Sequence, residues 1–375
     1  MIHKRLSTTP PPGDLITNSQ VGCNNTSNNQ STKAERDSNL ETLRIASIFL
    51  IVAMHVIGFA ASQGVLSTEN TYLRYFVGTI GNLGVSCFVL LSGYFGVKFS
   101  WKKFVYISLI TTVYACICSF CNSGYAVTGD MIMAIVWVPR YFNWYISCYL
   151  ALMLLSGYLN NFCNQLDRKD FMKLLVVLSV LFSLLPMMVS ANDVLLIRSG
   201  QCFTYFVFAY FIGRYIRIHK DIKLSRWKTG LTIFAMVLLM WLKGLLSMRI
   251  HALSMIPLTS NYSPTVLIAA ISCLYFFKSF SIQSRLINYI SASVLAMYLL
   301  DQLRPTVDRY ICVYKHTQDG DFILYVIIEV VVIFLVSFII DKIRVHLLDK
   351  PEKWITDNLV SVCRWIQSKI YAIID

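Results

Sequence analysis

Long apolar stretches alternate with short polar or charged ones along most of the chain. Apolar stretches of roughly 20 residues match the length of a helix that crosses the hydrocarbon core of a bilayer. Such a stretch crosses lipid only as a helix, because each backbone N–H and C=O group must find its partner within the segment, and no period-2 alternation indicates a barrel. We therefore expect an all-α, polytopic integral membrane bundle of about ten transmembrane helices. The predicted segments are about 40–62, 75–97, 104–121, 131–159, 171–190, 201–218, 230–247, 264–280, 287–303 and 322–340.

Polar stretches divide the chain into three regions. Residues 1–38 are rich in Ser, Thr, Asn and Pro, which predicts a disordered cytoplasmic tail. No basic–apolar–small cleavage pattern precedes the first apolar segment, so we expect no removable signal peptide. Residues 39–347 form the expected transmembrane domain, whose long fourth segment is broken by Pro139-Arg140. Residues 348–375 mix apolar and basic positions, which predicts a short interfacial helix on the cytoplasmic side.

Composition agrees with a membrane protein. Of the 375 residues, 56% are hydrophobic and 14% are charged, whereas soluble domains carry about 25% charged residues. The formal net charge of +13 would point to nucleic acid in a soluble domain, but no basic patch lies on such a domain, and we expect no nucleic-acid partner. With the N-terminus in the cytoplasm, 25 of the 33 lysines and arginines fall on the cytoplasmic side. That bias favours ten spans with both termini cytoplasmic.

The eleven cysteines indicate neither a disulfide framework nor a metal site. Most lie inside apolar stretches, where cysteine behaves as a small hydrophobic residue. Cys118 and Cys121 have redox-motif spacing but lack an αβ context. No cluster of histidine and cysteine has zinc spacing, so we expect no metal and no bound cofactor.

Arg44 and His55 stand out in the first predicted span. They are eleven positions apart, which returns to nearly the same helix face about 16 Å further along the axis. An arginine at one membrane surface and an imidazole near the midplane would then face the same space. Ionisable groups at that depth are costly and usually face a cavity or the bundle interior. His55 is either functional or a structural histidine paired with a neighbouring helix.

Five sequence features occur in a fixed order along the chain. They are Arg44 and His55 with ten residues between them, the stretch 81–94 as G-x-x-G-V-x-x-F-x-x-x-S-G-Y, Asn143-Trp144-Tyr145, Gly213-Arg214, and Met297-Tyr298-Leu299. This set resembles the membrane-bound acyltransferase family 3, the multi-span O-acyltransferases that modify bacterial polysaccharides and other envelope glycans. The resemblance covers roughly residues 40–345.

The resemblance implies that an acetyl or other acyl group moves from cytoplasmic acyl-CoA to a hydroxyl of a cell-envelope polysaccharide or lipid-linked sugar. Acetyl-CoA would be the donor substrate, and the protein would lie in the bacterial inner membrane. Acyl transfer from a thioester needs a base or a nucleophile, and a neutral imidazole can serve as either near pH 7. His55 is the one histidine of the six inside a predicted span, so we expect it to be the catalytic base or a transient acyl carrier. Arg44 would meet a CoA phosphate from the cytoplasm.

Other polar residues are candidates by their position. Those that could share the CoA phosphates lie on the predicted side of Arg44, where Lys and Arg collect regardless of function: Lys102, Lys103, Arg214 and Arg217. Those that could line the path of the acceptor or of pantetheine are Ser92, Tyr94, Asn143, Trp144, Tyr145, Tyr298 and Asp301. Glu329 lies inside the tenth predicted span, where a carboxylate is either functional or paired with a neighbouring helix.

The chain departs from the family pattern at two places. The family often ends its late motif as Tyr-Leu-x-His, whereas this chain has Asp301 at the last position. A carboxylate accepts a proton but cannot donate one as a neutral ring does. The family's arginine-rich stretch after the Ser-Gly-Tyr helix is represented by Lys98, Lys102 and Lys103, which bind phosphate without a bidentate fork. The extracytoplasmic hydrolase-like domain of many family members is not present in residues 1–375.

Two other functions share these features. A transporter or flippase of lipid-linked or polar solutes also has many spans and intramembrane charges, and often internal repeats and broken helices. No convincing repeat relates the two halves here, although Pro139 and Pro186 could break helices. A polysaccharide polymerase relies on a large extracytoplasmic loop, and the loops near 248–263 and 304–321 are short for that. The sequence leaves open the acceptor, the acyl chain and whether the protein forms homo-oligomers.

Overall fold

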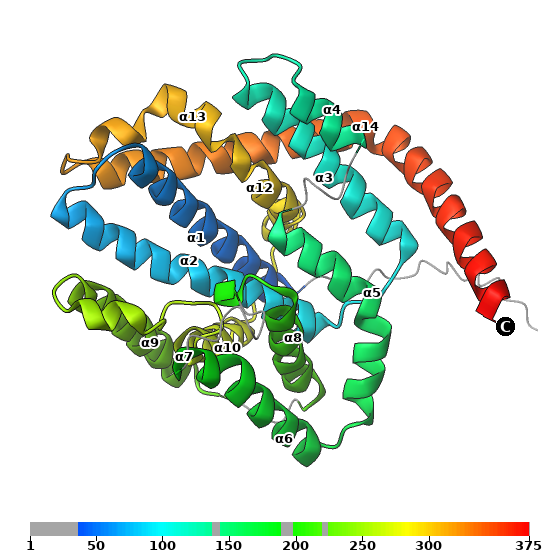
Figure 1. Ribbon diagram of the computed structural model, residues 1–375, viewed down its shortest axis with the longest axis horizontal. Coiled ribbons are helices and arrows are strands. Elements are labelled where there is room, and N and C mark those ends of the chain that lie inside the picture. The colour runs from blue at the N-terminus through cyan, green and yellow to red at the C-terminus, as the bar shows by residue number, and fades with distance from the viewer. Residues whose placement is uncertain (1–36, 137–142, 189–197, 220–223, 375) are drawn as a thin grey trace, which may run out of the picture. The chain divides into compact units, whose positions relative to one another are not determined.

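The computed structural model describes residues 37–136, 143–188, 198–219 and 224–374 (Figure 1). The chain from Arg36 onward forms one compact unit. Two expectations lie outside the described residues: the disordered tail, apart from its last two positions, and the break at Pro139-Arg140. In the described part all regular structure is helical, and no strand occurs.

The helices follow one another through short connections. In chain order they are α1 (Ser38–Gln63), α2 (Thr68–Phe95), α3 (Trp101–Asn122), α4 (Gly129–Val136), α5 (Trp144–Gln165), α6 (Arg168–Ser179), a π-helical turn (Val180–Leu184), α7 (Leu185–Met188), a 3-10 turn (Arg198–Gly200), α8 (Phe203–Ile218), α9 (Arg226–Ser247), a 3-10 turn (His251–Met255), α10 (Pro264–Lys278), α11 (Arg285–Ser291), α12 (Val294–Leu300), a 3-10 turn (Asp301–Leu303), α13 (Arg304–Ile311), a 3-10 turn (Val313–His316) and α14 (Phe322–Ile374).

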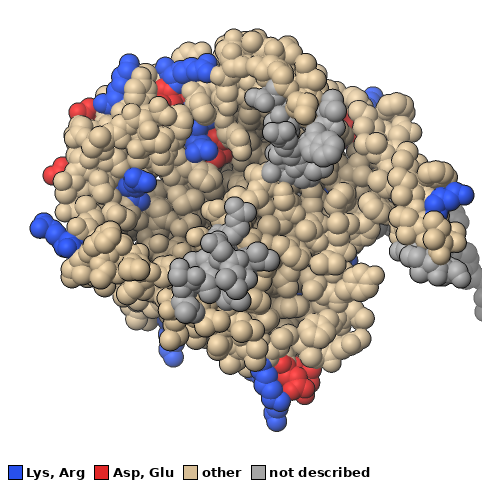
Figure 2. Space-filling model, in the orientation of Figure 1, with Lys and Arg blue, Asp and Glu red and all other residues tan. Residues whose placement is uncertain are grey.

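Among the described residues, eight helical segments are long and apolar enough to cross a membrane. They are Ser38–Gln63, Thr68–Phe95, Trp101–Asn122, Trp144–Gln165, Arg168–Met188, Arg226–Ser247, Arg285–Ile311 and Phe322–Ile370. Helices α8 and α10, with 16 and 15 residues, occupy the positions of the sixth and eighth predicted segments. Lysine, arginine, aspartate and glutamate side chains are few on the face of the molecule in Figure 2. The prediction of an all-α, multi-span membrane bundle is confirmed.

Helices α1 and α2 lie side by side in the middle of the bundle (Figure 1). Helix α1 also packs on α10, α11, α12 and α14, and α2 on α8, α9 and α10. A residue on another helix that contacts α1 or α2 therefore lies near the centre of the protein.

Glycines let α2 approach its neighbours closely. A Cβ at Gly84 would lie 2.7 Å from the carbonyl oxygen of Ser47 on α1, and a Cβ at Gly93 would meet the backbone of Tyr210 on α8. A Cβ at Gly78 would meet nothing within 4 Å. The packing role expected of small residues in membrane helices therefore holds at Gly84 and Gly93, and not at Gly78.

Helix α14 continues well past the tenth predicted span. Its 53 residues extend about 80 Å at the rise of an α-helix, against a hydrocarbon core of about 30 Å. The sequence predicts a separate interfacial helix over 348–375, but the helix runs on through Pro351 and turns partway along (Figure 1). The buried Arg344 bridges this proline, since its Nη1 lies 2.5 Å from Oε2 of Glu352. That ion pair holds together the helix turns on either side of the proline.

The ninth predicted span is not one regular helix. It contains α11, α12 and the 3-10 turn at Asp301–Leu303, and α13 continues the same apolar segment, Arg285–Ile311, beyond it. Breaks of this kind are tolerated at membrane depth where the backbone lies within protein or lines a cavity. This break gives the Asp301 side chain its position.

Candidate active site

A cavity of about 310 Å³ lies between α1, α2, α5 and the α11–α12 segment. Residues predicted from the sequence supply part of its wall: Arg44, His55, Ser92, Trp144, Tyr145 and Tyr298. Polar residues that sequence reasoning missed complete it, among them Tyr149, Gln201 and Ser291. The cavity thus combines one cation and one imidazole with an aromatic wall.

His55 and Asp301 form a hydrogen-bonded pair at this cavity. His55 Nδ1 lies 2.7 Å from Asp301 Oδ2. The aspartate side chain is 4% exposed, whereas the imidazole is 35% exposed and lines the cavity. When Nδ1–H donates to a carboxylate, Nε2 is the ring nitrogen left to accept a proton. A carboxylate in this position fixes the tautomer and stabilises the imidazolium once it forms.

Arg304 joins this pair from the first turn of α13. Its Nε lies 3.3 Å from Asp301 Oδ1 and donates to the Asp301 carbonyl oxygen at 3.0 Å. Its Nη1 donates to the His55 carbonyl oxygen at 2.9 Å. The guanidinium therefore ties α1 to the 3-10 turn that carries the aspartate. Sequence reasoning did not identify Arg304 as a site residue, although its spacing of three residues from Asp301 was a signal available in the sequence.

Arg44 lines the cavity eleven residues before His55. Its Nη1 lies 3.2 Å from Glu41 Oε1, and its guanidinium lies 5.1 Å from the ring centroid of Phe95. The two side chains face one space, as their spacing predicts. His55 stands 17 residues into a helix of 26, so it lies beyond the middle of α1, toward the end away from Arg44.

Aromatic rings form the wall contributed by α5. Tyr145 contacts Phe88, Phe206 and Tyr298 edge to face, with centroids 6.3, 5.0 and 5.3 Å away. Trp144 packs beside it at 5.8 Å. Edge-to-face packing of this kind holds aromatic side chains in fixed orientations. These contacts therefore fix the orientations of the Trp144 and Tyr145 rings that line the cavity.

A family model for an acyltransferase domain matches residues 37–342. The match covers all of the cavity and the His55–Asp301 pair. The chain belongs to acyltransferase family 3. No significant match is found among curated proteins or among solved structures.

In this family 3 acyltransferase, several predicted residues lie near the cavity without lining it. Asn143 caps α5, because its Oδ1 accepts a hydrogen bond from the Ile146 backbone at 3.0 Å, and it thereby positions Trp144 and Tyr145. The buried Tyr94 ring lies 5.1 Å from the Arg217 guanidinium and 4.8 Å from Lys278 Nζ.

The remaining predicted cation of α8 is also engaged outside the cavity. Arg214 donates to Asn164 Oδ1 at 3.1 Å, so it joins α8 to the end of α5. Tyr94, Arg214 and Arg217 therefore make contacts between helices near the Arg44 end of α1 and do not line the cavity.

Lys102 and Lys103 lie elsewhere. They line a separate recess between the start of α3 and the second half of α14, and Lys102 Nζ lies 2.9 Å from Asp357 Oδ1. Ile107, one turn further along α3, lines the cavity instead. The structure therefore separates the two lysines from Arg44, with which the sequence grouped them.

Glu329 is 1% exposed and does not line the cavity. Its Oε1 has no hydrogen-bond partner within the described part of the chain. The carboxyl interacts with Asp308, and Arg304 lies close by. Glu329 is thus a buried neighbour of the residues that hold Asp301.

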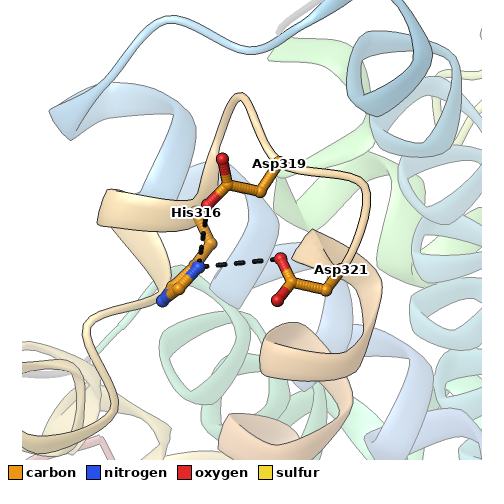
Figure 3. Close-up of side chains that lie close together, drawn as sticks. All are labelled: His316, Asp319 and Asp321. Carbon is orange, nitrogen blue, oxygen red and sulfur yellow. Dashed lines mark hydrogen bonds and ion pairs between the residues drawn. The ribbon is translucent and has the colours of Figure 1, made fainter.

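His316, Asp319 and Asp321 are the one group in the described residues whose donor atoms could converge on a metal ion (Figure 3). His316 Nδ1 lies 2.9 Å from Asp319 Oδ2 and 3.6 Å from Asp321 Oδ1. The imidazole stacks on Tyr325 at 3.5 Å, and none of the three residues lines the cavity. Both carboxylates therefore approach the same imidazole nitrogen. Asn70 of α2 donates from Nδ2 to the carbonyl oxygens of Thr317 and Asp319. These hydrogen bonds join the chain segment that carries His316 to the first turn of α2.

Proposed function

We propose that this membrane acyltransferase moves an acetyl or other acyl group from acyl-CoA to a hydroxyl of a cell-envelope polysaccharide or lipid-linked sugar. The observation that carries the proposal is the hydrogen bond between His55 and Asp301 at a cavity that Arg44 also lines. An oriented imidazole with a free ring nitrogen is the base that acyl transfer to a hydroxyl needs. Membership of the family supports acyl transfer as the reaction, and the cavity is the space in which donor and acceptor would meet.

The donor would enter at the Arg44 end. A guanidinium there suits a phosphate of CoA, which it meets through charge-assisted hydrogen bonds. His55 lies about 16 Å further along the same helix. A donor anchored by its phosphate therefore needs a long extended arm to present its thioester to the imidazole, and pantetheine is such an arm.

His55 would act as the general base. Its Nε2 accepts the proton of the acceptor hydroxyl while the oxygen attacks the thioester carbonyl carbon, and the imidazolium then returns that proton to the departing CoA thiolate. One C–O bond forms and one C–S bond breaks, with no net proton released. Asp301 stabilises the imidazolium between these two steps.

The acceptor would occupy the part of the cavity beside Trp144 and Gln201. Aromatic faces stack on the apolar faces of sugar rings, and an amide side chain supplies both a donor and an acceptor. The bias of Lys and Arg among the loops supports cytoplasmic N- and C-termini in a bacterial inner membrane. Acyl-CoA would then approach from the cytoplasm and the acceptor from the opposite side.

The test compares His55→Ala with wild type in a deletion strain of the native host. Membrane levels are matched by immunoblot, and O-acyl groups on surface glycans are measured by proton NMR before and after mild alkali. We expect alkali-labile acyl signals with wild type and none with His55→Ala.

His251→Ala is the matched control, because His251 is exposed and does not line the cavity. It should acylate like wild type. Normal acylation by His55→Ala would make this histidine structural and remove the proposed mechanism. Equal acyl content in every strain, the deletion included, would refute the acylation of surface glycans, and transport assays on lipid-linked solutes would follow.

A further inference from the structure

The recess that contains Lys102 and Lys103 is a second site, distinct from the cavity. It has a volume of about 320 Å³. Its wall on α3 is formed by the two lysines and Tyr106, and its wall on α14 by Asp349, Lys353 and Thr356. None of these residues lines the cavity.

Contacts on either side fix the two walls of the recess. Trp101 Nε1 donates to Gln367 Oε1 at 2.7 Å, and Lys102 pairs with Asp357 at 2.9 Å. Behind Tyr106, the buried Arg344 donates to the tyrosine hydroxyl at 3.4 Å. The recess is therefore a built feature of the α3–α14 contact.

The charges of the recess leave one cation without a partner. Lys353 pairs with Asp349 at 2.6 Å, and Lys102 pairs with Asp357. Deeper in the protein, Arg344 is matched by Asp341 and Glu352. Lys103 lines the recess with no ion pair or hydrogen bond to any described residue. It is the group that an anion would meet first.

Two sets of polar groups, one next to the recess and one lining it, also lack partners. Ser100 precedes α3 without making a side-chain cap hydrogen bond, so the first N–H groups of a 22-residue helix stay available to an anion. Thr356 is 1% exposed, lines the recess, and its Oγ1 has no partner among the described residues. By contrast, the Thr111 and Thr232 hydroxyls each donate to the carbonyl four residues before.

The position of the recess relative to the membrane indicates which anion it would encounter. It lies at the first turn of a membrane-spanning helix, where headgroups meet protein. The hydrocarbon core accounts for about 20 residues of α14, so Lys353 and Thr356 lie beyond it. Trp354 and Trp365 on the same helix are 71% and 62% exposed, and exposed tryptophans are typical of the headgroup level.

We propose that this recess binds the phosphate of a membrane phospholipid headgroup, through Lys103, the Thr356 hydroxyl and the start of α3. Lys102 and Lys353 stand beside the phosphate, each already paired with a carboxylate. The inference does not depend on the proposed acyl transfer, because it concerns a site that shares no residue with the cavity.

In the test, the purified full chain in detergent is titrated with short-chain phosphatidylglycerol, and binding is measured by isothermal titration calorimetry. Parallel titrations use inorganic phosphate and adenosine 3′,5′-bisphosphate, which carry free phosphate without a lipid tail. The variants are Lys103→Gln and Thr356→Val, with Lys169→Gln as the control, because Lys169 is exposed and lies outside the recess. Removing a charged hydrogen bond should weaken lipid binding about tenfold.

Lipid affinity that falls in both recess variants and stays at the wild-type value in Lys169→Gln supports the proposal. Equal affinity in all four proteins, or an equal loss in the Lys169 control, overturns it, because surface charge alone would then explain the binding. If only adenosine 3′,5′-bisphosphate binds in a way that depends on Lys103, the recess receives a soluble phosphate and the lipid assignment is wrong. Thermal unfolding in the same detergent checks that each variant is folded.

Discussion

At the scale of single residues, the His55–Asp301 pair explains a departure from the family pattern. The position that is often histidine in the family is an aspartate here, and its carboxylate lies 2.7 Å from the imidazole of α1. A buried carboxylate without a cationic or hydrogen-bonding partner would be costly at this depth. His55 and Arg304 are those partners. Asp301 in turn accepts from the imidazole and lies beside the guanidinium, so the polar groups of all three residues have partners.

Asp301→Asn tests this pair. The amide keeps the size of the side chain but cannot stabilise an imidazolium, and it can donate to Nδ1 and so favour the wrong tautomer. We expect the rate of acyl transfer at saturating donor to fall about 10²- to 10⁴-fold, with protein levels close to wild type. Radiolabelled acyl transfer by membranes that contain equal amounts of protein measures it. A rate within a factor of two of wild type would show that the carboxylate only satisfies the histidine.

Arg304→Lys tests the group that positions the pair. Lysine keeps the positive charge but loses the planar fork that reaches Asp301 and the His55 carbonyl together. We expect the maximal rate to fall about tenfold or more, since charged hydrogen bonds are lost, while KM for acyl-CoA stays near wild type. Arg309→Lys, the same change on an exposed residue of α13, is the control. A rise in KM alone would place Arg304 in donor binding instead.

At the scale of helices, the sequence predicted the elements better than the contacts between them. Apolar length is a local property, and it located α1, α2 and α3 to within about seven residues of their ends. The pairing of His55 with Asp301 joins positions 246 apart in the chain, and no local pattern encodes it. Where α14 continues through Pro351, Arg344 pairs with Glu352 of the same helix and also donates to the Tyr114 hydroxyl of α3 at 2.7 Å, a contact between distant parts of the chain.

The contact between α2 and α8 gives a prediction at this scale. Gly93→Ala places a Cβ against the backbone of Tyr210, and backbone cannot move aside as a flexible side chain does. We expect a loss of about 1–3 kcal/mol of stability from overpacking, measured as a lower thermal unfolding temperature in detergent.

Gly78→Ala on the same helix is the matched control, because its Cβ meets nothing within 4 Å. Alanine there should be neutral or should stabilise the helix by up to about 1 kcal/mol. Equal effects of the two substitutions would mean that helix propensity, and not the approach of α8, governs both sites.

At the scale of the whole molecule, the membrane topology links the cavity to its substrates. In the part of the chain that the structure describes, eight segments are long enough to cross the membrane, and α8 and α10 are shorter, at 16 and 15 residues. At 1.5 Å per residue they reach about 23–24 Å, somewhat less than a hydrocarbon core of about 30 Å. A short helix can still cross where the bilayer thins around it or flanking residues reach the interface. If both cross, ten spans place the Arg44 end of α1 and the C-terminus on one side.

This topology can be tested with single cysteines in a variant that lacks the eleven native ones. Ser62→Cys lies in the last turn of α1, Ser225→Cys precedes α9, and Ser254→Cys follows α9; all three positions are exposed. In intact cells we expect a membrane-impermeant thiol reagent to label Cys at 62 and 254, and to label the one at 225 only after permeabilisation. Labelling of 225 in intact cells would mean that α8 does not cross. The lysines and arginines of the loops would then no longer collect on one side of the membrane. Their distribution would no longer support the approach of acyl-CoA at the Arg44 end.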